Sequence, residues 1–219
     1  MLKNGEFVKI EYDAYDENGN LFDSTRGEIA KALHKKEGPL LVVIGKHRLI
    51  KGLDIAIRSM SQGEETEFEF NEANAFGKRS KEYTKIMRTE DFARYNVAPQ
   101  PGLTVHLDTE QGRIYGTIKS VSGGRVLVDF NHPLSGQKVR YKVKITEVIT
   151  SPEDRLRAIG EDIGVLSSVS LKDGTATFEI QKDDSFEEKK AVIMVMTKSF
   201  MPEIKKIEVL EAKPPSKKA

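Results

Sequence analysis

The sequence contains no cysteine and no tryptophan, and its longest apolar runs, 40–44 and 191–196, are short. Without cysteine the chain forms neither disulfides nor thiolate metal sites, although this absence selects no cellular compartment. A bilayer is crossed by about 20 apolar residues in a helix, and the first ten residues carry no apolar core typical of a secretory signal. We therefore expect a cytoplasmic protein that does not insert into membranes.

No charge of one sign dominates either. Lysine and arginine total 35 and aspartate and glutamate 34, which leaves a formal net charge of +1. This balance gives no general attraction to nucleic acid or to an anionic membrane, although a local basic patch is compatible with it. With 219 residues and 38% hydrophobic content, the chain can build one or two cored domains and a small third.

Residues 44–60 contain a short helix around which the first half of the chain is organised. Leu53, Ile57 and Met60 recur at helical spacing from Gly52 onward and form one apolar stripe. Gly63 follows in a position that favours the left-handed conformation ending a helix. Residues 65–70 then alternate as a strand with one buried face. A single short helix among strands predicts an antiparallel sheet wrapped on that helix.

Four further segments read as strands of this sheet: 7–14, 21–25, 40–44 and 141–148. Asn18-Gly19 predicts a hairpin between the first two, and 26–36 reads as a polar, weakly helical loop. The segment 141–148 alternates in the register of the opening strands. We interpret it as the last strand of the first sheet, which makes the preceding β segments an insertion. A tandem arrangement of two domains fits the same periodicities.

The intervening region predicts a compact all-β unit of three strands, 103–108, 114–121 and 125–130. The charged passage 79–94 precedes these strands. Six apolar residues of this region are too many for so small a unit to bury completely. They are Phe92, Val97, Leu103, Val105, Ile114 and Leu127.

Residues 151–219 predict a third, α+β region. Ser151-Pro152 starts a helix, and Asp173-Gly174 turns a hairpin. Ser185 opens a capping box for a second helix, whose residues 191–196 are apolar around nearly the whole circumference. Such a helix is covered on two sides, either by a second subunit or within its own domain. A strand at 206–210 follows, and we expect the tail 213–219 to be disordered.

The motifs of common catalytic sites are missing. The sequence has no glycine-rich phosphate loop, no nucleophile elbow and no closely spaced histidine pair. Its four histidines lie in different segments without ligand spacing, so each is expected to be an exposed loop or strand residue. They are His34, His47, His106 and His132. A hydrolase or a metalloenzyme is therefore disfavoured.

Several short motifs occur in a characteristic order: Tyr12, Asn18-Gly19, Phe22-Asp23-Ser24, Gly45 followed by 49–53, and Ala75-Phe76-Gly77. In this order and spacing the chain resembles the FK506-binding-protein type of peptidyl-prolyl isomerase. More closely, it is similar to the SlyD-like and long archaeal members, in which a chaperone module interrupts the isomerase. The segment 131–136 resembles the sequence with which the chain returns to the isomerase.

The resemblance implies an α+β fold with three domains. An FKBP-like isomerase domain would comprise 1–81 and 132–150, with its antiparallel sheet wrapped on a short helix. An inserted small all-β domain, the insert-in-flap chaperone domain, would comprise 82–131, and a C-terminal α+β domain 151–219.

The resemblance also implies a proline pocket, with the Ile50 backbone N–H holding a substrate carbonyl. Its catalytic residues would be Tyr12, Phe22, Asp23, Leu49, Ile50, Leu53, Phe76 and Tyr141. Phe76 stands where the short members have a tyrosine, and Tyr141 where they have a phenylalanine. The lost hydroxyl at position 76 should weaken macrolide binding more than turnover. No cofactor or metal is implied.

The resemblance thus predicts a peptidyl-prolyl cis-trans isomerase with chaperone activity that acts on unfolded, proline-containing polypeptides and forms a homodimer. One alternative is a non-catalytic holdase with a degenerate pocket. The substitution at Phe76 supports this alternative, whereas the intact Tyr12, Asp23 and Ile50 argue against it. Another is a nucleic-acid-binding β-barrel built on 99–131. The four basic or aromatic residues that it would use are scattered among acids: Arg113, Tyr115, Lys119 and Arg125.

Overall fold

The computed structural model describes residues 1–46, 48–110, 112–164 and 166–212. These residues form two compact units, one within 1–70 and 139–212 and one within 71–138. The tail 213–219 and His47, for which the sequence predicts disorder and exposure respectively, lie outside the described residues.

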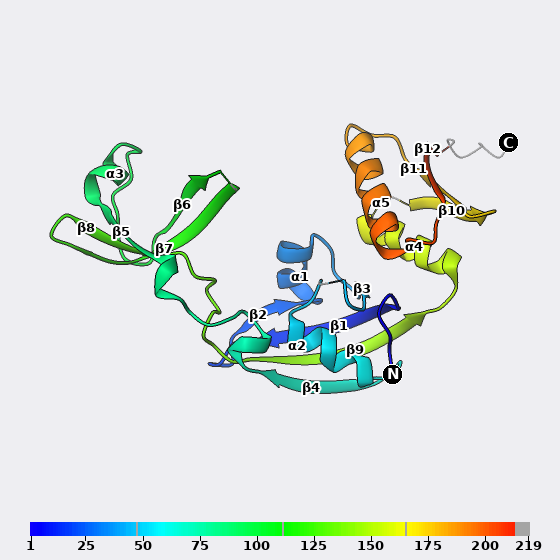
Figure 1. Cartoon of the computed structure of the whole chain (residues 1–219), viewed down its shortest axis with the longest axis horizontal. Helices are drawn as coiled ribbons and strands as arrows, with labels where there is room; N and C mark the ends of the chain where they lie inside the picture. Colours follow the sequence, from blue (N-terminus) through cyan, green and yellow to red (C-terminus); the bar gives the residue numbers. More distant parts are fainter. Residues whose placement is uncertain (47, 111, 165, 213–219) are drawn as a thin grey trace. The chain divides into compact units, whose positions relative to one another are not determined.

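The first unit begins with a five-stranded antiparallel sheet (Figure 1). Its strands are β1 (Phe7–Tyr15), β2 (Leu21–Ser24), β3 (Leu40–Val43), β4 (Glu65–Phe70) and β9 (Val139–Ile149). The order is β2-β1-β9-β4, with β3 also paired to β1. Because β9 pairs with both β1 and β4, it completes the first sheet, and a tandem arrangement of two separate sheets does not describe this topology.

The short helix predicted after Gly52 is α2 (Lys51–Ala56), which a 3₁₀ turn, Ile57–Ser59, extends. Leu53 and Ile57 are fully buried and Met60 is 3% exposed, so the predicted apolar stripe is confirmed. The helix contacts β4 (Figure 1). Gly63 has the predicted positive φ, +85°. The helix has a single apolar face, and this face is buried, as expected for a short helix on which a sheet wraps.

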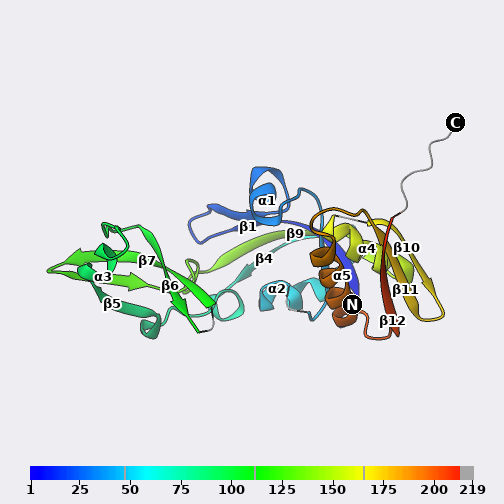
Figure 2. The ribbon, with the colours of Figure 1, turned by 90° about the horizontal axis from the view of Figure 1, so that it is seen from above.

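A second helix, α1 (Gly27–His34), lies where the sequence predicts a weakly helical loop. Its buried face consists of a single residue, Ala30, and Lys31 pairs with Glu28 at 2.8 Å on the exposed side. A helix of eight residues with one buried side chain leaves too short an apolar pattern to recognise. The helix contacts β2, and Figure 2 shows it from above.

The C-terminal part of the first unit packs two helices on a three-stranded sheet (Figure 1). Its elements are α4 (Pro152–Ile163), β10 (Leu166–Lys172), β11 (Thr175–Ile180), α5 (Phe186–Phe200) and β12 (Lys206–Glu211). Strands β11 and β12 are parallel and joined through α5. Ser151 Oγ accepts a hydrogen bond from Asp154 N at 3.3 Å, which confirms the predicted cap. The predicted capping box at Ser185 is wrong, because that hydroxyl donates to Asp183 Oδ1 at 2.9 Å and does not cap α5.

One hydrophobic cluster joins this part to the five-stranded sheet. Phe7, Leu41, Val43 and Ile149 come from the sheet, and Leu156, Ile159, Phe178 and Ile193 are among the residues from the C-terminal elements. The rings of Phe7 and Phe200 meet edge to face at 6.2 Å. The C-terminal part is therefore fixed on the sheet by a shared core.

The second unit, residues 71–138, contains a four-stranded sheet. Its elements are the 3₁₀ turns Glu72–Asn74 and Lys81–Tyr83, β5 (Thr84–Arg88), α3 (Thr89–Ala93), β6 (Thr104–Thr109), β7 (Gly112–Ser122) and β8 (Arg125–Asp129). The predicted three-stranded unit is therefore wrong by one strand, because the charged passage supplies β5, which pairs with β8 at one edge. Of the five side chains of β5, three are exposed and two half-buried, so an alternating apolar pattern is absent.

Among the described helices, none is long and apolar enough to cross a membrane.

Candidate active site

Two tyrosines on neighbouring strands form the centre of the candidate site. Tyr12 on β1 is 3% exposed and Tyr141 on β9 is 5% exposed. Tyr141 pairs with Ala14 in the β1–β9 register, which places it beside Tyr12 on the same face of the sheet. Their ring centroids are 5.8 Å apart at an interplanar angle of 45°. The alternation of both strands therefore brings together two residues that are 129 positions apart in sequence.

Two phenylalanines from the outer strands complete this group. Phe22 on β2 and Phe70 on β4 each lie 6.0 Å from Tyr141, in edge-on contact at 82° and 60°. We call Tyr12, Phe22, Phe70 and Tyr141 the aromatic cluster. Phe70 is absent from the predicted site residues, although the alternation of 65–70 already placed it on the buried face. Tyr12, Phe70 and Tyr141 are buried and Phe22 is half-buried, and the edge-on aromatic contacts stabilise the rings in one arrangement.

Asp23 is held at the margin of this cluster by two donors. The Tyr12 hydroxyl donates to Asp23 Oδ2 at 2.8 Å, and His34 Nε2 lies 2.8 Å from Asp23 Oδ1. An ionised carboxylate only accepts hydrogen bonds, so His34 acts as a donor through Nε2–H. The side chains of Asp23 and His34 are each 22% exposed. Each carboxylate oxygen of Asp23 therefore has a partner within the protein.

The structure corrects the prediction that His34 is an exposed loop or strand residue. His34 is the last residue of α1 and is half-buried, with its ring 6.3 Å from that of Tyr12 at 79°. The signal in the sequence is its spacing: His34 follows Ala30, the buried residue of α1, by four positions, which places both on one face of a helix. Recognising it requires knowing that residues 27–34 are helical.

The backbone of Tyr12 is fixed by the chain that follows Asp23. Thr25 Oγ1 accepts a hydrogen bond from Tyr12 N at 3.0 Å, and Thr25 N donates to Tyr12 O at 3.0 Å. Thr25 is 1% exposed. These bonds join the backbone of Tyr12 to the residue two positions after Asp23, so the position of Tyr12 does not depend on side-chain packing alone.

Both buried phenols remain protonated over the physiological range. Burial raises the pKa of Tyr12, and the negative charge of Asp23 raises it further. Burial also raises the pKa of Tyr141, with a smaller contribution from Asp23. The Tyr12 hydroxyl therefore donates to Asp23 throughout this range.

Three predicted site residues lie at and before the start of α2. Leu49 and Ile50 are half-buried, and Leu53 is fully buried. Ile50 is the N-cap of α2, and its carbonyl accepts from Asp54 N at 3.1 Å, which fixes the peptide at the helix entrance. That these residues form a wall of the pocket, and that the Ile50 N–H binds substrate, stay predictions.

Phe76 belongs to the second unit, where its ring stacks on that of His132 at 4.4 Å and 3°. Its carbonyl accepts from Ser135 Oγ at 3.0 Å, which joins the Ala75-Phe76-Gly77 motif to the returning segment. The participation of Phe76 in the pocket stays a prediction. Of the eight predicted residues, the structure thus brings Tyr12, Phe22, Asp23 and Tyr141 into one contiguous group.

This arrangement suits binding more than bond-breaking chemistry. Asp23 is engaged on both oxygens, and Tyr12 is a protonated phenol, so neither is an activated nucleophile or a general base. The group consists of packed aromatic rings beside a carboxylate that is held by two hydrogen bonds.

Comparison with known proteins gives two family matches. A model described as FKBP-type peptidyl-prolyl cis-trans isomerase matches residues 1–97. A model described as FKBP26, IF domain, matches residues 85–134.

Among curated proteins, the chain is similar to a short-type peptidyl-prolyl cis-trans isomerase of Methanocaldococcus jannaschii, with 26% identity over 153 residues, covering 68% of this chain and 94% of that protein. It is 30% identical over 149 residues to the FKBP-type peptidyl-prolyl cis-trans isomerase SlyD of Aeromonas hydrophila, covering 68% of this chain and 65% of the relative. The SlyD of Helicobacter pylori is 28% identical over 156 residues, with coverage of 71% and 79%.

Proposed function

The chain belongs to the FKBP-type peptidyl-prolyl cis-trans isomerase family, and on this premise we propose that the aromatic cluster and Asp23 form the pocket in which X–Pro bonds rotate. The observation that carries this assignment is the position of Asp23, which Tyr12 and His34 hold beside the buried aromatic rings. A degenerate pocket would not be expected to keep a carboxylate so fixed. We therefore favour an active isomerase over a non-catalytic holdase.

The proposed mechanism rests on the electronic structure of the amide. Rotation about an X–Pro bond is slow because it breaks amide resonance, with a barrier near ~20 kcal/mol. The twisted amide is less charge-separated than the planar one, so a surface that removes water from the carbonyl favours the twisted state. The rings of Phe22, Phe70 and Tyr141 provide such a surface and can pack against the pyrrolidine ring.

Asp23 has an electrostatic and orienting role in this proposal. Its carboxylate is fixed before substrate arrives, so it needs no reorganisation during rotation. No proton moves and no covalent bond forms, which agrees with an aspartate that is already hydrogen-bonded on both oxygens.

A protease-coupled tetrapeptide assay on the full chain tests the assignment. Asp23→Asn and Tyr141→Ala should each lower kcat/KM by roughly tenfold or more, as expected when one fixed polar group or one aromatic wall is lost. Asp13→Asn is the matched control. Asp13 is also a hydrogen-bonded carboxylate, contacting Ser24 Oγ at 2.6 Å, but it points away from Tyr12 because neighbouring residues of a strand face opposite sides. If the two site variants kept the activity of the control, our site would be wrong.

We further propose that the second unit holds unfolded chains. It contains a groove of about 620 Å³, whose apolar lining includes Met87, Phe92, Val97, Leu103, Val105 and Leu107. Tyr95, at the same groove, is 81% exposed, and Leu103 is 39% exposed. Of the six apolar residues that were too many to bury completely, Phe92 is 6% exposed and belongs to the core of the unit, whereas Leu103 and Ile114 are 39% and 38% exposed. An exposed apolar groove in the same chain as a catalytic domain raises the local concentration of client prolines without changing the chemical step.

The chaperone proposal is tested with exposed groove residues, which can change without loss of the core. The double variant Tyr95→Ser with Leu103→Ser should abolish suppression of aggregation and slow proline-limited refolding of a protein client. Tetrapeptide turnover should stay within about twofold, since the peptide is too short to need a second site. Ile86→Ser is the control: Ile86 is 67% exposed on β5 but does not line the groove. Equal effects of the double variant on peptide and protein substrates would contradict the proposal.

We propose that two copies of the chain associate through α5. Its residues 191–196 are covered on one side only: Ile193 is fully buried, whereas Val192, Met194 and Val195 are 44%, 42% and 69% exposed. The described domain therefore does not sandwich this helix, and a second copy would bury the exposed apolar residues.

The clients in this proposal are unfolded or partly folded polypeptides containing proline, and we place the protein in the cytoplasm. We do not favour the nucleic-acid-binding alternative, because the basic residues that it would use lie among acids in the sequence. Arg113, for example, is paired with Asp108 at 2.9 Å.

A further inference from the structure

The last turn of α4 carries two acids where the helix itself disfavours them. Glu161 and Asp162 stand at the negative end of the helix dipole, and this turn has no basic residue. Gly164 then ends the helix with a φ of +76°. An acidic helix end costs stability unless cations from elsewhere compensate for it, so these two residues point to contacts outside α4.

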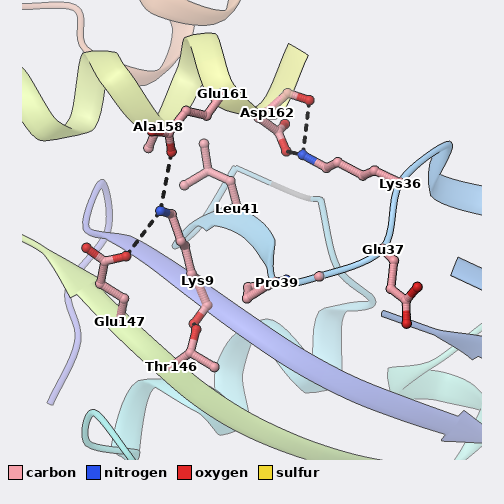
Figure 3. Close-up of a pocket in the computed structure, with 11 residues that line it drawn as sticks. Lys9, Lys36, Glu37, Pro39, Leu41, Thr146, Glu147, Ala158, Glu161 and Asp162 are labelled. Atoms are coloured by element: carbon pink, nitrogen blue, oxygen red, sulfur yellow. Dashed lines mark hydrogen bonds and ion pairs between the residues drawn. The ribbon is translucent and has the colours of Figure 1, made fainter. Parts of the chain in front are cut away.

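Asp162 finds two such cations on the isomerase side of the shared core. Lys36 Nζ donates to Asp162 Oδ1 at 2.8 Å and to Asp162 O at 3.1 Å (Figure 3). Arg48 Nη1 donates to Asp162 Oδ2 at 2.7 Å and to Leu41 O at 3.0 Å. The Asp162 side chain is 6% exposed, whereas those of Lys36 and Arg48 are 36% and 31% exposed. Two charge-assisted hydrogen bonds to a nearly buried carboxylate fix the positions of the groups that take part, and removing one partner is costly.

The two cations belong to the two segments that border the candidate site. Lys36 follows His34, the donor to Asp23, by two residues. Arg48 immediately precedes Leu49 and Ile50, the residues at the entrance of α2. One carboxylate therefore joins the segment that fixes Asp23 to the segment that leads into α2.

We propose that Asp162 is a positioning residue of the isomerase site, which the C-terminal helix α4 supplies to hold segments 34–36 and 48–50 in place. This inference rests on the site proposed above. Asp162 does not touch the aromatic cluster; it acts through Lys36 and Arg48. The helix that carries it is fixed independently, because Leu156 and Ile159 of α4 are fully buried in the cluster that includes Leu41 and Val43 of the sheet.

The neighbouring Glu161 provides a matched control. It also bonds across to the isomerase side, 3.5 Å from Lys9 Nζ, which in turn pairs with Glu147 at 3.1 Å (Figure 3). Lys9 lies on β1, whose position is set by the sheet, and not in either segment beside the site. Glu161→Gln thus removes the same charge from the same helix turn, and the two acids differ in their partners and in exposure, which is 50% for the Glu161 side chain and 6% for that of Asp162.

The test compares Asp162→Asn, Arg48→Met and Glu161→Gln in the full chain, by tetrapeptide kcat/KM and by amide NMR. Asp162→Asn should lower kcat/KM by about three- to tenfold, the scale of one lost charge-assisted hydrogen bond. It should also shift or broaden the amide signals of both His34 and Ile50. Arg48→Met should affect Ile50 but not His34, and Glu161→Gln should leave both signals and kcat/KM unchanged. Thermal unfolding shows that each variant is folded at the assay temperature.

The outcomes separate this inference from the proposed site. If Asp23→Asn lowers activity but Asp162→Asn leaves kcat/KM and both amide signals as in Glu161→Gln, the positioning role is refuted and the site stands. If Asp162→Asn shifts both signals while neither it nor Asp23→Asn changes activity, the site assignment fails although the contact exists. If Asp162→Asn is unfolded, the Arg48→Met variant tests the inference instead. The inference is overturned if the amide signal of Ile50 and kcat/KM are both unchanged in Arg48→Met.

Discussion

Replacing His34 by leucine removes one of the two donors that fix Asp23 while keeping a side chain of similar size against the Tyr12 ring. The substitution leaves Asp23 Oδ1 without the contact that His34 Nε2 makes at 2.8 Å, and the Tyr12 hydroxyl still donates to Oδ2. Asp23 is then free to rotate about the remaining bond. We expect slower isomerisation from a protein that is still folded.

The size of the effect follows from the exposure of the pair. A hydrogen bond to a charged group contributes about 1.5–3 kcal/mol. The two side chains are each 22% exposed, so water replaces part of the lost bond and the lower end of that range applies. About 1.4 kcal/mol corresponds to a tenfold change in rate if all of it is expressed in the transition state, and to about threefold if half of it is. We therefore expect kcat/KM to fall by about three- to tenfold.

The assay is tetrapeptide isomerisation, and His34→Gln is the conservative comparison. Its amide can donate to Asp23 as the imidazole does, so it should recover most of the activity that His34→Leu loses. Tyr12→Phe should cost a similar factor, and the double variant should lose less than the product of the two factors, because both donors act on one carboxylate. The reasoning is refuted if His34→Leu stays within about twofold of the parent, or if His34→Gln is as impaired as His34→Leu.

Three further predictions concern stability and assembly. Val195→Glu, on the exposed face of α5, should convert a dimer seen by sedimentation at micromolar concentration into a monomer, whereas a parent that is already monomeric would contradict the proposed interface. Thr197 is fully buried and its hydroxyl lacks a hydrogen-bond partner among the described residues, so Thr197→Val should raise the free energy of unfolding by about 1 kcal/mol in urea. Burial raises the pKa of Asp129, but hydrogen bonds from Arg79 and Asn131 outweigh it and hold that pKa below its ordinary 3.8. The stabilisation is therefore complete above pH 3.8 and is lost as the pH falls through the lower, folded-state pKa, and Asp129→Asn should flatten this acid dependence when followed by NMR of residues 71–138.

The sequence predicts elements well where one face is buried and the pattern is long. From Val8 onward on β1, Val8, Ile10 and Ala14 are fully buried and alternate with half-buried residues, so this part of the strand keeps the period of two. The apolar stripe of α2 and the turn that follows it, formed by Leu53, Ile57 and Met60, is buried as its helical spacing predicts. The alternation of residues 141–148 favoured a place in the first sheet but also fitted a tandem arrangement, and the pairing of β9 with both β1 and β4 decides between the two.

The elements that sequence reasoning missed bury little. Strand β5 has no buried side chain, and α1 buries only Ala30. Both are stabilised by contacts with distant segments, β5 through pairing with β8 and α1 through contact with β2. Local patterns record only the burial of a segment's own side chains, so segments held in this way remain invisible to them.

The same difference separates the residues of the candidate site, according to whether the segment that carries them has a clear burial pattern. Tyr12, Phe22 and Tyr141 lie on strands whose register the pattern predicts, and the structure brings them together. His34 reaches Asp23 from a helix that the pattern does not predict, so its role could not be assigned from sequence. Phe76 belongs to the second unit, which the alternation of the first sheet does not describe, so its part in the pocket stays a prediction.

Acidic residues at the C-terminal end of a helix are unfavourable, because they lie at the negative end of the helix dipole, and this can be recognised from the sequence. Helix α4 is an example. Glu161 and Asp162 oppose the dipole of their own helix, which indicates that distant residues compensate for them. The sequence does not say which residues these are, since Lys36 and Arg48 lie 126 and 114 positions away. The structure supplies both partners: Lys36 is two residues from His34, which contacts Asp23, and Arg48 precedes the predicted site residues Leu49 and Ile50. A residue that is unfavourable in its own helix thus marks a position that tertiary contacts stabilise. Because the partners of Asp162 are Lys36 and Arg48, we assign this residue a role in function as well as in stability.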